Sequence, residues 1–101
     1  DYAKAYFNLA WIQATCPNAR YRDGKNAIVN AGKANQLNGG KDLAYILTLA
    51  AAYAEDGKFD KAVEWQTKAI ELAPENHKER LRSRLELYKV GKPYRQEPKE
   101  P

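Results

Sequence analysis

Residues 44–74 carry two successive patterns of apolar residues at helical spacing. The first consists of Leu47, Leu49, Ala50, Tyr53 and Ala54, and it stops at Gly57. The second consists of Phe59, Ala62, Val63, Ala69, Ile70 and Leu72, and it stops at Pro74. Apolar residues at this period lie on one face of a helix, and glycine and proline commonly end helices. The pattern therefore predicts a hairpin of two helices over residues 42–74.

A similar hairpin is predicted over residues 1–38. Its first helix ends at Cys16-Pro17, because proline cannot continue the helical hydrogen bonding. Asp23 is a candidate N-cap for the second helix, and Asp42 is one for the hairpin that follows.

A fifth helix is predicted over residues 76–91. Asn76 and Glu79 have the spacing of a capping box, and Leu81, Leu85 and Tyr88 form an apolar side that would cover the open end of the second hairpin. Leu87 and Val90 lie off this side; we expect them to be exposed, with contact to a second chain as the alternative. Residues 94–101 form a polar tail that we expect to be frayed.

The two hairpins are related by an internal repeat. In their second helices, Ala27 corresponds to Ala62 and Ala34 to Ala69, an offset of 35 (62 − 27); Leu37 and Leu72 correspond in the same way, and Leu37 is expected to face inward. In their first helices, Ala10 corresponds to Ala50, an offset of 40 (50 − 10). The difference of 5 (40 − 35) indicates an insertion in the turn between Cys16 and Gly24.

The order of small, aromatic, glycine and proline positions in residues 44–74 resembles the tetratricopeptide repeat. The residues that carry the resemblance are Leu49, Ala50, Tyr53, Gly57, Ala62, Ala69 and Pro74. Gln66 departs from the family pattern, which usually has an aromatic residue there. The resemblance implies an all-α domain over residues 1–93: a right-handed stack of two antiparallel hairpins and a capping helix. It also implies a role in protein–protein interaction.

Composition and charge exclude only a few classes of function. The net charge of +4 is modest, and basic and acidic residues alternate, which favours a solvated surface over nucleic-acid binding. The single Cys16 excludes an internal disulfide framework. The chain shows no signal or transmembrane segment, but it opens at Asp1 without Met and directly in a helical pattern, as an excised fragment would. We therefore assign no compartment. The layout as a whole is similar to C-terminal repeat modules of large multidomain bacterial proteins.

Candidate catalytic chemistry is absent from the sequence pattern. His77 is the single histidine, and no cysteine is spaced to share a metal with it. Cys16 has no histidine nearby in sequence to act as its base, and a half-buried thiol at a turn is the simpler reading. Gly39-Gly40-Lys41 lacks the rest of a phosphate-binding loop. We therefore predict no enzyme, no metal and no cofactor.

The resemblance also implies a binding surface for a protein or peptide, since the first helix of each repeat lines the concave side of such stacks. The family's groove-facing positions map onto Lys4, Phe7, Asn8 and Trp11 in the first hairpin and onto Ala44, Leu47, Thr48, Ala51 and Glu55 in the second. Phe7 and Trp11 are either apolar anchors for a partner or core residues that pack on a neighbouring helix, and the sequence leaves both open. Leu47, Thr48 and Ala51 carry no charge, so the basic arrangement with which some members hold a carboxylate is missing.

Two further roles remain open. Two hairpins are fewer than the roughly three repeats that such stacks usually need, so a second copy could complete the packing as a homo-oligomer. Arg80, Arg82 and Arg84 of the last helix could bind a nucleic acid, although Glu79 and Glu86 interrupt them and favour a solvated face. Arg80 and Arg84 share a side of the helix and Arg82 does not.

Overall fold

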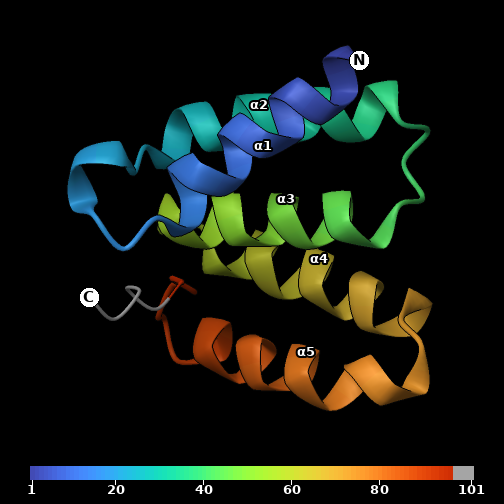
Figure 1. Cartoon of the computed structure of the whole chain (residues 1–101). Coiled ribbons are helices and arrows are strands. Elements are labelled where there is room, and N and C mark those ends of the chain that lie inside the picture. The colour runs from blue at the N-terminus through green and yellow to red at the C-terminus, as the bar shows by residue number, and fades with distance from the viewer. Residues whose placement is uncertain (97–101) are drawn as a thin grey trace, which may run out of the picture.

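The computed structural model describes residues 1–96, in which the chain forms five α-helices and no strand. The helices are α1 (Tyr2–Thr15), α2 (Gly24–Leu37), α3 (Leu43–Glu55), α4 (Phe59–Leu72) and α5 (Glu75–Lys89), with a short 3-10 helix η1 (Ala19–Tyr21) between α1 and α2. Figure 1 shows the pairs α1/α2 and α3/α4 stacked on each other, with α5 at the end of the stack. The predicted all-α helical-repeat fold is confirmed.

Alanine dominates the contacts between the helices. Eleven alanines of the described chain are 0–1% exposed: Ala10, Ala14, Ala27, Ala31, Ala34, Ala50, Ala51, Ala52, Ala54, Ala62 and Ala69. A methyl side chain lets two helix backbones approach closely, and the larger half-buried Tyr53 and Trp65 fill the space that remains between the hairpins. The repeat pair Ala27 and Ala62 thus occupies equivalent buried places in the two hairpins.

Two of the three predicted helix N-caps are confirmed, and the third is wrong. The Asp23 carboxylate accepts a hydrogen bond from the Asn26 amide, and the Asp42 carboxylate accepts one from the Ala44 amide, as predicted for N-caps. The predicted capping box of Asn76 and Glu79 is wrong, because α5 begins one residue earlier and has no side-chain cap. Pro74 holds the extended conformation that precedes the helix, and its carbonyl accepts a hydrogen bond from the His77 amide.

Helix α5 covers α4 through an apolar side and one buried amide. Leu81 and Tyr88 are 0% and 1% exposed, as predicted. The Gln66 Nε2 of α4 donates a 2.9 Å hydrogen bond to the Leu81 carbonyl of α5, so the residue that departs from the family pattern joins these two helices. Val90 is exposed as expected, whereas Leu87 is half-buried against the core.

The inserted turn between α1 and α2 is tied down by one arginine. The Arg22 guanidinium donates hydrogen bonds to the Cys16 and Pro17 carbonyls and forms an ion pair with Glu55 of α3. At the end of this turn, α2 begins directly against the C-terminal end of α3: a Cβ on Gly24 would lie 2.7 Å from the Asp56 nitrogen. Glycine at position 24 therefore permits a close approach of two backbones.

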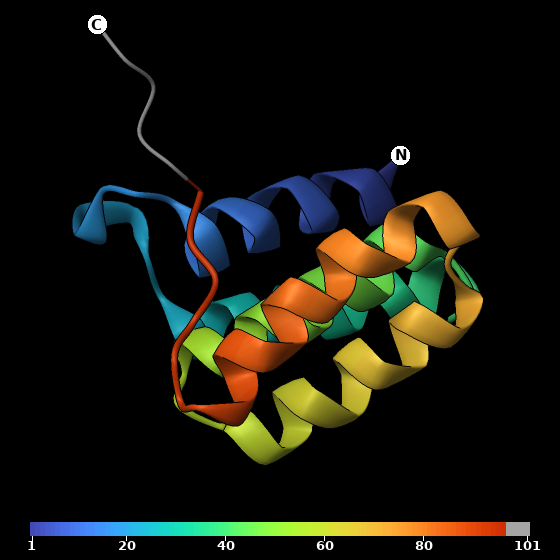
Figure 2. The ribbon, with the colours of Figure 1, turned by 90° about the horizontal axis from the view of Figure 1, so that it is seen from below.

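The predicted frayed tail is wrong for residues 94–96, which pack on the helices. After α5 the chain turns back toward the C-terminal end of α1 (Figure 2). The Gln96 amide donates a 2.8 Å hydrogen bond to the Thr15 carbonyl. The Arg95 guanidinium donates two 3.1 Å hydrogen bonds to the Glu55 carboxylate. We call residues 91–96 the return segment; the remainder of the predicted tail, 97–101, lies outside the described residues.

Two leucines of the repeat pattern face solvent. Leu37 and Leu72, the last residues of α2 and α4, are 55% and 51% exposed. The prediction that Leu37 faces inward is wrong, because the buried part of α2 ends with Ala34, one turn earlier. The repeat relation between these two positions therefore reflects equivalent places at helix ends, not core packing.

Candidate partner-binding site

A hollow of about 270 Å³ lies between α1, α3 and α5. Its lining comes from Phe7 and Trp11 of α1, Ala44, Leu47 and Thr48 of α3, and Arg80 and Arg84 of α5. Five of these residues belong to the nine groove-facing positions predicted from the sequence: Phe7, Trp11, Ala44, Leu47 and Thr48. The fold thus brings residues from three helices, and from both ends of the chain, to one place. We call it the α1–α3–α5 hollow.

Phe7 and Trp11 of α1 both pack on neighbours and line the hollow. The Phe7 ring stacks on the Tyr45 ring with centroids 4.6 Å apart and planes 6° from parallel. The Trp11 ring lies 6.0 Å from that of Tyr94 in the return segment, tilted by 37°. Both residues remain half-buried. The core alternative is therefore met in part, since each ring packs on a neighbour while its residue stays partly accessible at the hollow.

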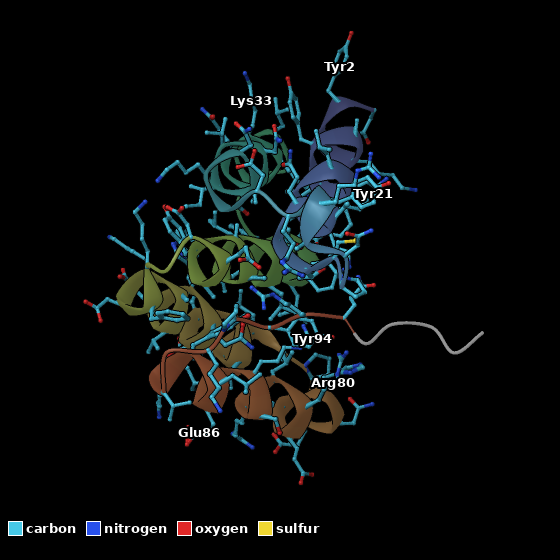
Figure 3. All side chains as sticks on the ribbon, turned by 90° about the vertical axis from the view of Figure 1, so that its left-hand side faces the viewer. Tyr2, Tyr21, Lys33, Arg80, Glu86 and Tyr94 are labelled. Carbon is cyan, nitrogen blue, oxygen red and sulfur yellow. The ribbon has the colours of Figure 1, made fainter. Side chains whose placement is uncertain are left out.

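Two arginines of α5 form the cationic wall of the hollow. The Arg84 Cζ lies 4.0 Å from the Tyr94 ring centroid and 5.9 Å from that of Trp11. The Arg80 Nη2 atom lies 3.4 Å from the Nδ1 atom of His77. Figure 3 shows Arg80 and Tyr94 on the same side of the molecule, with Glu86 on the other side of α5. The sequence pattern favours a solvated face for this arginine run, and the spacing of four residues between Arg80 and Arg84 predicts that these two share a side of the helix.

The other predicted residues take different positions. Lys4 and Asn8 are exposed on α1, available to a partner. Thr48 is 1% exposed and donates its hydroxyl to the Ala44 carbonyl, so it forms the floor of the hollow. Ala51 is 1% exposed within the core. The Glu55 carboxylate is occupied by Arg22 and Arg95 and is 12% exposed.

A larger and more open hollow of about 820 Å³ lies between α2, α3 and α4. Its walls include Ile28, Val29, Lys33, Tyr53 and Trp65, and none of the predicted partner-binding residues. Lys33 lies far from Arg80 and Tyr94 in the side view (Figure 3). The rest of its lining consists of Leu49, neutral amides and glycines.

The structure does not strengthen the case for the other candidate sites considered in the sequence. Within residues 1–96, no three potential metal-ligating side chains come together. Cys16 is a half-buried free thiol and His77 is exposed, as expected. A hydrogen bond from Lys58 lowers the pKa of the Asp56 carboxyl at the turn between α3 and α4, which is a structural role. No described helix has the length and apolar character that crossing a membrane requires.

Two stacked hairpins of alanine-packed helices with an end helix define a helical-repeat protein. The comparison with family models refines this class: the model of the tetratricopeptide repeat matches residues 44–76. The match spans α3, α4 and the start of α5, and it supports the resemblance derived from that part of the sequence. Repeats of this family generally mediate protein–protein interaction. No curated protein and no solved structure matched the chain.

Proposed function

We propose that this chain is a non-catalytic interaction module that binds a peptide or protein partner in the α1–α3–α5 hollow. The observation that carries the proposal is that the half-buried Phe7 and Trp11 line a hollow of about 270 Å³ together with Leu47. Half-buried aromatic rings held in place by neighbours are suitable anchors, because little side-chain entropy is lost when a partner covers them.

The binding surface in this proposal is narrower than the predicted one. Phe7, Trp11, Leu47 and Thr48 line it, and the exposed Lys4 and Asn8 contact the partner beside it. Ala51 and Glu55 act through the fold, since Ala51 is buried and Glu55 holds the return segment.

Ala44 offers a direct test because it is exposed and lines the hollow without packing in the core. Peptides enriched from a random display library are measured against the wild type, Ala44→Gln and Ala5→Gln. We expect Ala44→Gln to weaken binding by at least about tenfold, since its longer side chain fills the hollow. Ala5→Gln makes the same change at an exposed position of α1 that does not line the hollow, and it leaves affinity unchanged. An absence of enriched peptides, or equal affinities in all three proteins, would contradict the proposal.

Homo-oligomerisation is a second candidate, favoured by an exposed apolar row on α1. Tyr2, Leu9 and Ile12 are 82%, 46% and 48% exposed and recur at helical spacing. Light scattering behind a sizing column at two well-separated concentrations decides it: a constant mass near 11.5 kDa excludes assembly, and a doubled mass favours it.

We also propose that the module belongs to a larger multidomain bacterial protein and that its packed part extends through Gln96 rather than ending at residue 93. The hydrogen bond between Gln96 and Thr15 supports the second part. The layout of the inserted turn and the Gly-Lys-Pro-Tyr sequence at 91–94 supports the first.

A further inference from the structure

We propose that the α1–α3–α5 hollow is selective for a peptide carrying an acidic side chain next to an apolar one, and that Arg80 and Arg84 of α5 recognise the carboxylate. This inference rests on the proposed function and names the chemistry of its partner. The charge comes from the capping helix and not from α3, whose residues in the hollow are neutral.

The first argument is that these two arginines have no acidic partner among the described residues. Within residues 1–96, neither Arg80 nor Arg84 forms an ion pair, whereas Arg22 and Arg95 both pair with Glu55. Because Glu55 is occupied twice, it does not neutralise the wall of the hollow. Two cations four residues apart on α5 therefore face the same apolar hollow without a described counter-charge.

The second argument is that Arg84 is already oriented. Its guanidinium lies 4.0 Å from the centroid of the Tyr94 ring and near Trp11. A guanidinium that lies over a ring keeps its in-plane N–H donors for another ligand, and those donors match the two oxygens of a carboxylate. No hydrogen bond occupies them within the described part of the chain. Such pre-orientation lowers the entropic cost of forming a two-point contact.

The third argument concerns the neighbouring surface. Phe7, Trp11 and Leu47 line the same hollow as the arginines, so an apolar side chain adjacent to the acidic one would be buried by the same contact. A nucleic acid would instead need a longer basic track with several stacking rings. Arg82 points elsewhere on α5, which leaves only a pair of cations at the hollow.

The test compares one enriched peptide with its Glu→Gln or Asp→Asn analogue on the wild type, Arg80→Gln, Arg84→Gln and Arg82→Gln. All three variants lose one positive charge, but Arg82 does not line the hollow. We expect the wild type and Arg82→Gln to prefer the acidic peptide by about tenfold or more. We expect Arg84→Gln to lose most of that preference and Arg80→Gln to lose part of it. Arg80 is exposed, so its variant tests the proposal even if Arg84→Gln disturbs the packing of Tyr94.

Several results would overturn the inference while leaving the proposed function intact. One is a set of enriched peptides that bind Ala44→Gln more weakly than the wild type but share no acidic position. Another is an unchanged acidic preference in both Arg80→Gln and Arg84→Gln. A single-stranded oligonucleotide that displaces the peptide and binds more tightly would overturn it in favour of nucleic acid. Failure of every peptide to bind would instead reject the proposed function itself.

Discussion

At the scale of single residues, Tyr88 combines burial with an unpaired hydroxyl. It is 1% exposed, and its hydroxyl has no hydrogen-bond partner among the described residues. Burial raises the pKa of this phenol well above its ordinary value, because the charged form would be cut off from water. The unfolded chain would lose this proton near pH 10, whereas the folded chain retains it.

Tyr88 should therefore make stability fall at alkaline pH. Its contribution is fully present below pH 10 and declines above it, by up to about 1.4 kcal/mol per pH unit until the raised folded pKa is reached. We expect Tyr88→Phe to remove this slope and, near pH 8, to leave the free energy of unfolding unchanged or raised by about 1 kcal/mol. Urea unfolding at pH 8 and about pH 10.5 measures the free energy of unfolding and its change with pH. The control is Tyr21→Phe, which makes the same change at an exposed tyrosine. A clear loss of stability in Tyr88→Phe at pH 8 would show that the hydroxyl is bonded.

The position of Gly24 is constrained by the neighbouring backbone at Asp56. A Cβ there would lie 2.7 Å from the Asp56 nitrogen and 2.8 Å from its Cα, so the backbones would have to separate. We expect Gly24→Ala to lower the free energy of unfolding by about 1–3 kcal/mol. Gly32→Ala, in the middle of the same helix with nothing within 4 Å, should raise it by about 0.5–1 kcal/mol. Thermal unfolding of the two variants compares them, and equal stability would contradict the close approach of α2 and α3.

At the scale of elements, the return segment is held to the helices through Glu55. Its carboxylate pairs with Arg22 of the inserted turn at 3.3 Å and with Arg95 at 3.1 Å. Glu55→Gln should lower the free energy of unfolding by roughly 1–3 kcal/mol, because it leaves the mostly buried Arg22 guanidinium without its counter-charge. It should also speed hydrogen exchange of the Gln96 amide, whose bond to Thr15 depends on the position of this segment.

The matched control is Glu86→Gln, which removes an exposed pair with Lys89 on the other side of α5 (Figure 3). It should leave both stability and the exchange of the Gln96 amide nearly unchanged. If the two glutamine variants behave alike in hydrogen exchange, Glu55 does not hold the return segment.

At this same scale, the sequence predicted the helices well because each one carries a helical period and a stop signal. Asp23 and Asp42 were predictable as N-caps, since a carboxylate there accepts an amide that is otherwise unpaired. The capping box at Asn76 was not, because Pro74 already fixes the start of α5. The packing of Tyr94 and Gln96 also escaped prediction, because it joins residues about 80 positions apart and leaves no local pattern.

At the scale of the whole molecule, the candidate site was half predictable. The repeat resemblance placed Phe7, Trp11, Leu47 and Thr48 on one surface, and the structure brings them together in one hollow. The contribution of Arg80 and Arg84 was missed, because the way α5 closes over that surface depends on its contact with α4 through Gln66 and Leu81. A local charge pattern carries no information about such a contact.

The chain offers a built-in way to locate the partner, since its two tryptophans line different hollows. Trp11 lies in the α1–α3–α5 hollow and Trp65 lies in the larger hollow between α2, α3 and α4. The most direct measurement is therefore an NMR titration of the isotope-labelled chain with an enriched peptide, following the two indole N–H signals. The account predicts that the Trp11 signal shifts with saturation while the Trp65 signal stays in place. A shift confined to Trp65 would place the partner on the opposite face and contradict the account.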